Sequence, residues 1–147
     1  MSWIKIDTGI RVHAKVLKLA RLTNEHPLTA VGFLVSFWGW AVDNAPDGIL
    51  DATEFETIAR ELGWPGDCAN LAKTLISCGR NGGDGLLEQR EDGSLLIHDW
   101  KEWAGAYIKE RELARQRMKR KRERDSGVTR TLRERYAARR KKEEGRY

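Results

Sequence analysis

The sequence predicts a mainly α-helical protein with one small β-hairpin. Most apolar residues recur at spacings of three and four, which is typical of helices that bury one face. The tight-turn dipeptide Asp92-Gly93 is flanked by short apolar segments and indicates the hairpin. The residues after Ile108 include few apolar positions, so they add little to a buried core.

The charge of the chain changes sign after Ile108. Residues 1–108 contain 10 Lys and Arg against 15 Asp and Glu, a net charge of −5, whereas residues 109–147 contain 17 against 7, a net charge of +10. A length of 147 residues allows one ordinary domain with an appendage. We therefore expect a body, residues 1–108, that folds as one domain, and a tail, residues 109–147, that is helical or disordered.

Two helices are expected early in the body. Trp3–Asp7 alternates apolar with polar residues, which predicts a short edge strand or an extended lead-in. A helix over Val12–Leu22 follows, and the apolar residues of its inner face are Val12, Val16, Leu19 and Ala20. Pro27 is suited to the first position of the next helix, and Leu28–Val42 is apolar nearly all the way round, which is typical of a central helix.

The central helix also indicates self-association. Phe33, Phe37 and Trp40 lie outside its main apolar stripe, which consists of Leu28, Val31, Leu34, Val35 and Trp38. This is more apolar surface than one small body is expected to cover. We therefore expect a homo-oligomer, at least a dimer.

A helix–turn–helix outline follows a turn at Asn44–Gly48 and a two-residue strand, Ile49-Leu50. Thr53 and Glu56 have the spacing of a capping box, and the helix after them has four inward residues: Phe55, Ile58, Ala59 and Leu62. Gly63–Gly66 ends that helix. Asp67 is suited to cap the second helix of the pair, which extends to Cys78.

The rest of the body predicts a hairpin and an anchoring helix. The glycine-rich loop Gly79–Gly85 leads into Leu86–Glu91 and Ser94–His98, which flank the turn; the length of this loop predicts a mobile hairpin. Asp99 and Glu102 bracket the start of a last helix that is anchored by Trp100, Trp103, Ala104 and Tyr107. The order of elements is that of a winged helix–turn–helix, with the hairpin as the wing.

The tail carries two dense basic clusters. We expect a solvated helix over Lys109–Arg124, an interruption at Asp125–Gly127 and a second basic segment over Val128–Tyr147. The clusters are Arg115–Arg122 and Arg139–Lys142. Such a charge excess favours contact with nucleic-acid phosphates over two alternatives, simple solubility and an anionic membrane. The tail has no stripe of large apolar residues, which counts against a membrane.

The helix that begins at Asp67 carries a polar stripe, Asn70, Lys73, Thr74 and Ser77, with the chemistry to read DNA bases. The helix–turn–helix segment is not basic, so the alternative is a protein-docking or purely structural face, which we favour. The expected DNA-binding residues are Asn70, Lys73, Thr74, Ser77, Arg80, Arg90, Arg115, Arg117, Lys119, Arg120, Lys121, Arg122, Arg139, Arg140, Lys141 and Lys142.

Several functions are not expected. Cys68 and Cys78, ten residues apart in one helix, are too far apart for a disulfide, and no spacing of cysteine and histidine typical of zinc is present. No motif indicates a cofactor or an enzyme, because His98-Asp99 are only sequence neighbours. Ala30–Val42 is too short to span a membrane and Met1–Asp7 does not resemble a signal peptide, so a cytoplasmic protein is expected.

The body resembles the amino-terminal domain of phage replisome organisers, which are DnaD-like replication-initiation proteins. The resemblance covers about residues 3–108 and rests on Trp3–Thr8, His13–Val16, the Trp-rich helix ending in Asn44–Gly48, and Leu96–Trp100. It implies a winged-helix domain that recognises origin DNA or self-associates and helps to load the replicative helicase. Family members commonly have a further carboxy-terminal domain where this chain has a basic tail, which suggests a reduced version.

The sequence therefore predicts a DNA-binding protein of phage or prophage replication, with the helicase or its loader as the expected protein partner. Two alternatives stay open. One is a winged-helix transcriptional regulator. The other is a protein-interaction adaptor that does not read DNA and whose tail is merely solubilising.

Overall fold

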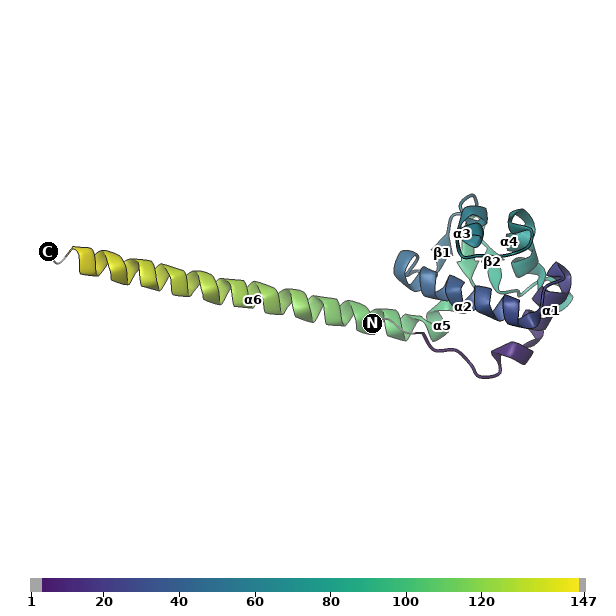
Figure 1. Ribbon diagram of the computed structural model, residues 1–147, viewed down its shortest axis with the longest axis horizontal. Helices are drawn as coiled ribbons and strands as arrows, with labels where there is room; N and C mark the ends of the chain where they lie inside the picture. Colours follow the sequence, from purple (N-terminus) through teal and green to yellow (C-terminus); the bar gives the residue numbers. More distant parts are fainter. Residues whose placement is uncertain (1–3, 146–147) are drawn as a thin grey trace. The chain divides into compact units, whose positions relative to one another are not determined.

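The structure is a computed structural model that describes residues 4–145, and it is mostly helical with a small three-stranded antiparallel sheet (Figure 1). The chain divides after Ile108 into two units. The first contains, in order, η1 Ile10–Val12, α1 Ala14–Thr23, α2 Pro27–Asn44, β1 Ile49–Leu50, α3 Phe55–Glu61, α4 Cys68–Ser77, η2 Arg80–Gly82, β2 Leu87–Gln89, β3 Leu95–Ile97 and α5 Trp100–Trp103. Helix α6, Gly105–Glu144, begins in the first unit and forms the described part of the second.

The amino-terminal segment was predicted to be an edge strand or an extended lead-in. Residues 4–7 form no strand, which contradicts the first alternative and is compatible with the second, and Trp3 lies outside the described residues. Helix α1 begins at Ala14 because His13 is extended and its ring accepts a hydrogen bond from the Lys15 amide at 3.3 Å. Val12 therefore precedes the helix and is 66% exposed, whereas the other three expected inner residues are buried.

Helix α2 begins at Pro27 as predicted and lies at the centre of the body. Phe33 packs edge-to-face on Trp64 with ring centroids 5.2 Å apart, and Phe37 packs in the same way on Phe55 at 5.5 Å. Both side chains are buried inside one body, whereas Leu28, which was expected to point inward, is 57% exposed. The aromatic surface that motivated the expected dimer is thus mostly covered within the chain itself.

Helices α3 and α4 confirm one predicted cap and contradict the other. Helix α3 begins at Phe55 without a side-chain cap, because the Thr53 hydroxyl donates to the Asp51 carboxylate at 2.7 Å instead of capping the helix. The predicted capping box is therefore wrong. Asp67 caps α4 as predicted and accepts hydrogen bonds from the amides of Ala69 and Asn70.

The sheet has the order β1-β3-β2, with Leu50 opposite Leu95 and Gln89 opposite Leu95 on its other side. The hairpin is confirmed, but its connection is not the predicted two-residue turn. The Arg90 amide donates to the Ser94 carbonyl at 2.8 Å, which leaves a three-residue loop, Glu91–Gly93. Gly93 has φ +84°, the left-handed position that such loops require.

Trp100, near the carboxyl end of the body, packs against the turn before β1. The Trp100 indole donates to the Pro46 carbonyl at 2.9 Å, and a Cβ on Gly48 would lie 2.5 Å from that indole. Asp99 does not cap α5; it has φ +53° and its carboxylate pairs with His98 Nε2 at 3.1 Å. Trp100 and Ala104 are buried as expected, and the side chain of Trp103 lies outside the described residues.

Helix α6 continues through Asp125–Gly127, so the predicted interruption is wrong. The Ser126 hydroxyl donates to the Glu123 carbonyl at 2.8 Å, within the helix. A glycine inside a helix costs only about 1 kcal/mol relative to alanine, which does not force a break. None of the described side chains of α6 is fully buried, as expected for a solvated helix.

Candidate nucleic-acid interface

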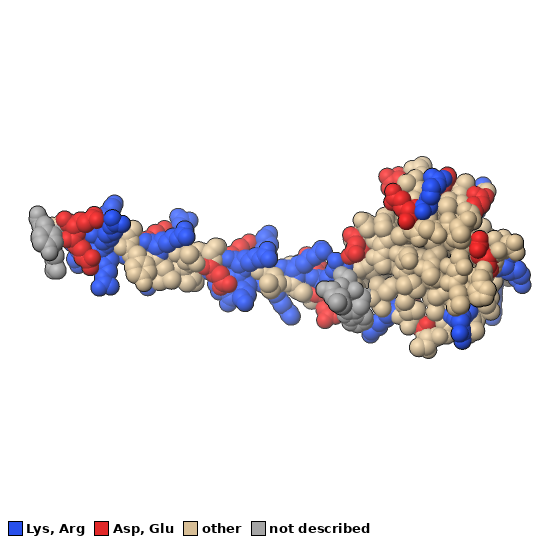
Figure 2. All heavy atoms as spheres, viewed as in Figure 1, with Lys and Arg blue, Asp and Glu red and all other residues tan. Residues whose placement is uncertain are grey.

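The first basic cluster, Arg115–Arg122, is fully exposed, and Lys and Arg side chains are seen along α6 in Figure 2. Within the described residues its six cations form no ion pair, so their charges are not compensated locally. At 100° per residue the six cations point to all sides of the helix. One duplex can therefore contact only about half of the tail's cations at a time.

The second basic cluster, Arg139–Lys142, is partly compensated. Arg139 pairs with Glu143 at 3.5 Å and Arg140 with Glu144 at 3.1 Å, each one turn further along the helix. Exposed pairs of this kind are weak, so a phosphate can compete for these guanidinium groups. Of the two clusters, the first therefore has more positive charge that is not compensated by ion pairs.

The polar stripe of α4 is largely engaged within its own helix. The Asn70 amide donates to the Asp67 carboxylate at 2.7 Å, and the Thr74 hydroxyl donates to the Asn70 carbonyl at 3.2 Å. The Ser77 hydroxyl donates to the Thr74 carbonyl at 3.3 Å. Only Lys73 has no such bond within the described residues, so the other three side chains are oriented by their own helix.

Carboxylates beside the stripe and the hairpin oppose an approaching phosphate. The pKa of Asp67 is lowered, chiefly by the hydrogen bond from the Asn70 side chain, so the group is charged beside the stripe. At the hairpin tip the pKa of Asp92 is lowered, chiefly by the Ser94 hydroxyl. Arg90, an expected DNA contact, lies 3.7 Å from Asp92 and is partly neutralised by it.

Arg80, also an expected contact, belongs to a basic pocket that the sequence interpretation did not anticipate. It lines a pocket of about 650 Å³ together with Lys15, Lys18 and Arg21 of α1. Arg80 therefore shares a site with α1, not with the α4 stripe. For α1 the sequence pattern predicted only an apolar inner face. Counting charges by segment would have found the signal, because residues 8–24 contain four cations and no carboxylate.

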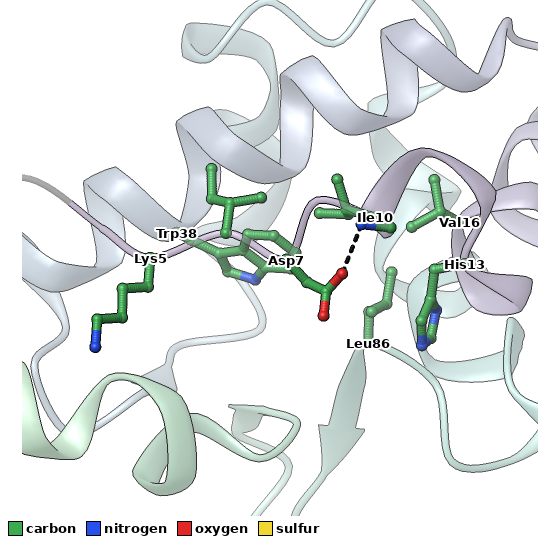
Figure 3. A pocket seen from close by; sticks show the side chains of 9 residues that line it. Lys5, Asp7, Ile10, His13, Val16, Trp38 and Leu86 are labelled. Carbon is green, nitrogen blue, oxygen red and sulfur yellow. Dashed lines mark hydrogen bonds between the residues drawn. The ribbon is translucent and has the colours of Figure 1, made fainter.

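A second pocket, of about 490 Å³, is shown in Figure 3. Its walls are mainly apolar and include Ile10, Val16, Trp38 and Leu86. Three charged or polar side chains line it, and two of them are engaged in local structure: Asp7 accepts from the Gly9 amide at 2.6 Å, and the His13 ring caps α1, whereas the third is Lys5. They do not form the arrangement of nucleophile, base and orienting group that catalysis requires.

His98 is also structural in its contacts. Its Nδ1 pairs with the Glu88 carboxylate of β2, and its Nε2 pairs with Asp99. Within the described residues no group of three or more potential ligands is placed to hold a metal ion, and both cysteines are free thiols. The described helices include none with the length and apolar character needed to cross a membrane.

Comparison of the chain with protein-family models, with curated proteins and with solved structures gives no match. The geometry of the chain's own residues therefore carries the functional argument. That geometry combines a body with a complete core of its own and a tail with closely spaced, largely uncompensated cations.

Proposed function

We propose that this protein is a non-enzymatic, cytoplasmic DNA-binding protein whose tail contacts backbone phosphates. The observation that supports the proposal most directly is the first basic cluster, Arg115–Arg122, which is exposed and without ion pairs in the described part of the chain. Lys and Arg side chains that neutralise phosphates release condensed counterions, and this release supplies most of the affinity for duplex DNA.

The body fits the proposal as a winged helix–turn–helix. Helices α2, α3 and α4 are followed by the β2–β3 hairpin, and β1 pairs with Leu95 and Leu96 of β3. This order supports the winged-helix assignment. The resemblance of the body to phage replisome organisers extends the proposal to replication initiation, with the helicase or its loader as partner; a transcriptional regulator is the alternative within the same class.

A different function for the body, protein docking, is favoured by the α4 stripe. Because one N–H of the Asn70 side-chain amide is bonded to Asp67, the orientation of this amide is set within its own helix and not by a base. The body has a net charge of −5, which further weakens its hold on DNA. We therefore propose that the tail binds DNA and that α4 presents a surface to a protein partner.

The test compares the full chain with a protein that ends at Ile108. Among the described residues, every buried apolar side chain lies between Val16 and Ala104, so the shortened body keeps all of them. If the tail engages about six phosphates, the logarithm of the binding constant for duplex DNA falls with the logarithm of salt at a slope near −5. We expect removal of residues 109–147 to make that slope less steep by about 5.

A full-length control replaces six cations of the first cluster with Gln. This variant keeps the chain length and is expected to lose about half of the tail's contribution to the slope, because about three of the six cations can face one duplex. Titrations from about 50 to 200 mM salt cover the range in which the difference is largest. An unchanged affinity and slope after removal of the tail would contradict the proposal.

A further inference from the structure

Four cations of the body line one pocket. The body contains 10 Lys and Arg in all, and four of them line the pocket between α1 and the glycine-rich loop: Lys15, Lys18, Arg21 and Arg80. One carboxylate, Asp84, lines the same pocket. A local excess of positive charge therefore exists on a body whose net charge is −5.

The two lysines are held in place by the glycine-rich loop. Lys15 Nζ donates to the Gly85 carbonyl at 3.2 Å, and Lys18 Nζ donates to the Gly79 carbonyl at 2.6 Å. Their stems are half-buried, so part of the entropy cost of ordering them is met by folding. An ammonium group has three donors, so each lysine keeps two for another acceptor.

The two arginines are free to bind. Arg21 and Arg80 are exposed, and within the described residues neither forms an ion pair or a hydrogen bond through its side chain. Each guanidinium offers a planar set of donors that matches two phosphate oxygens. The pocket thus combines two fixed ammonium groups with two uncompensated guanidinium groups.

The charges of both lysines are felt at the floor of the pocket. Burial raises the pKa of the Cys78 thiol, and the positive charges of Lys15 and Lys18 partly offset that rise. Cys78 lines the pocket and is buried. An anion in the pocket would experience the same two charges.

Three of the four cations form a row along α1, and the length of this row indicates which kind of ligand fits it. Lys15, Lys18 and Arg21 are separated by three residues each, which gives about 9 Å along the helix axis. A DNA strand carries one phosphate per roughly 3.4 Å of duplex axis, and its winding round the axis places neighbouring phosphates further apart than this rise, so the three side chains of the row cover about two phosphates. A lone phosphate would occupy only part of it.

We propose that the basic pocket formed by α1 and the Gly79–Gly85 loop is a second DNA-binding site, which holds about two backbone phosphates of one strand. The site rests on the proposed DNA partner but not on the tail. It gives the body an anchor on α1 and the loop, formed by residues other than those of the α4 stripe. It assigns to Lys15 and Lys18 a function beyond holding the loop.

The experiment uses the double variant R21Q/R80Q, in the full chain and in the protein that ends at Ile108. We expect the salt slope for duplex DNA to become less steep by about 2 in both proteins, because each lost phosphate contact removes about one unit. The matched control is R60Q/K101Q, which removes two exposed cations of the body outside the pocket and is expected to leave the slope unchanged. Circular dichroism checks that both variants are folded.

The charge-preserving variant R21K/R80K is expected to restore the wild-type slope. Equal losses in R21Q/R80Q and R60Q/K101Q would show a general charge effect and overturn the site. A titration of amide resonances with inorganic phosphate distinguishes a small-anion site: shifts of the loop amides with phosphate, without any effect of R21Q/R80Q on DNA binding, would also overturn the proposal. An unchanged slope in the tail-truncated protein relative to the full chain would instead count against the tail and leave this site standing.

Discussion

Gly79 and Gly85 are the positions where a single methyl group is expected to be most damaging. A Cβ at Gly79 would lie 1.8 Å from the Gly83 carbonyl oxygen, and one at Gly85 would lie 2.0 Å from the Leu75 carbonyl oxygen. Both obstacles are backbone atoms, so the loop itself must move. We expect Gly79→Ala and Gly85→Ala each to lower the free energy of unfolding by about 3 kcal/mol, as measured by urea denaturation.

Gly83 supplies the control in the same loop. No atom lies within 4 Å of its ideal Cβ, and its φ of −125° is accessible to alanine. Gly83→Ala is expected to leave stability within about 0.5 kcal/mol of the wild type. An equal loss of stability in Gly83→Ala and Gly79→Ala would contradict the prediction that contact with backbone atoms causes the loss.

The two cysteines are expected to differ in reactivity. Burial raises the pKa of Cys78, so less of it is thiolate at neutral pH, and the thiolate is the reactive form. Cys68 is partly exposed at the start of α4. We expect alkylation at neutral pH, followed by mass spectrometry, to modify Cys68 well before Cys78. Comparable rates would show that the pocket floor opens frequently.

At the scale of elements, the cap of α4 predicts a pH dependence. The pKa of Asp67 is lowered in the folded protein, chiefly by the Asn70 side chain, so the cap contributes fully above the pKa of the unfolded chain. That contribution is lost as the pH falls through the folded value. Asn caps helices as well as Asp does but does not titrate in this range. We expect the stability of the wild type relative to Asp67→Asn to decrease on acidification, as measured by urea denaturation.

Asp67→Ala is the reference variant, because it removes the cap at every pH. It is expected to be less stable than both other proteins at neutral pH and to approach the wild type in acid. A difference between wild type and Asp67→Asn that does not change with pH would contradict the role of the carboxylate.

At the scale of the whole molecule, the packing of α2 changes the expected oligomeric state. Phe33 and Phe37 are buried against Trp64 and Phe55, so they are not free to form a dimer interface. The exposed large apolar side chains of the body include Leu17, Leu22 and Leu28, and single residues of this kind are normal on a monomer. We expect the protein that ends at Ile108 to sediment as a monomer at all accessible concentrations. A molecular mass that rises with protein concentration would contradict this expectation and support a dimer.

Local signals were sufficient for much of the fold. Pro27 and Asp67 mark the starts of α2 and α4 correctly, because a fixed φ and a side-chain cap act within a few residues. At Thr53 and Asp99 the predicted caps are wrong because the side chains contact other near neighbours instead, Asp51 and His98. At each position a helix cap and a contact with a neighbouring side chain are both possible, and the sequence pattern does not show which of the two forms.

The sequence by itself determined the helical periods, the hairpin and the division of charge between body and tail, because these depend on residue types within a short stretch or on simple counting. Only the tertiary structure decided which cations share a pocket. Lys18 reaches the Gly79 carbonyl across 61 residues of chain, and Lys15 reaches the Gly85 carbonyl across 70. Such contacts exist because folding brings α1 against the glycine-rich loop, where Gly79 and Gly85 leave room for no side chain.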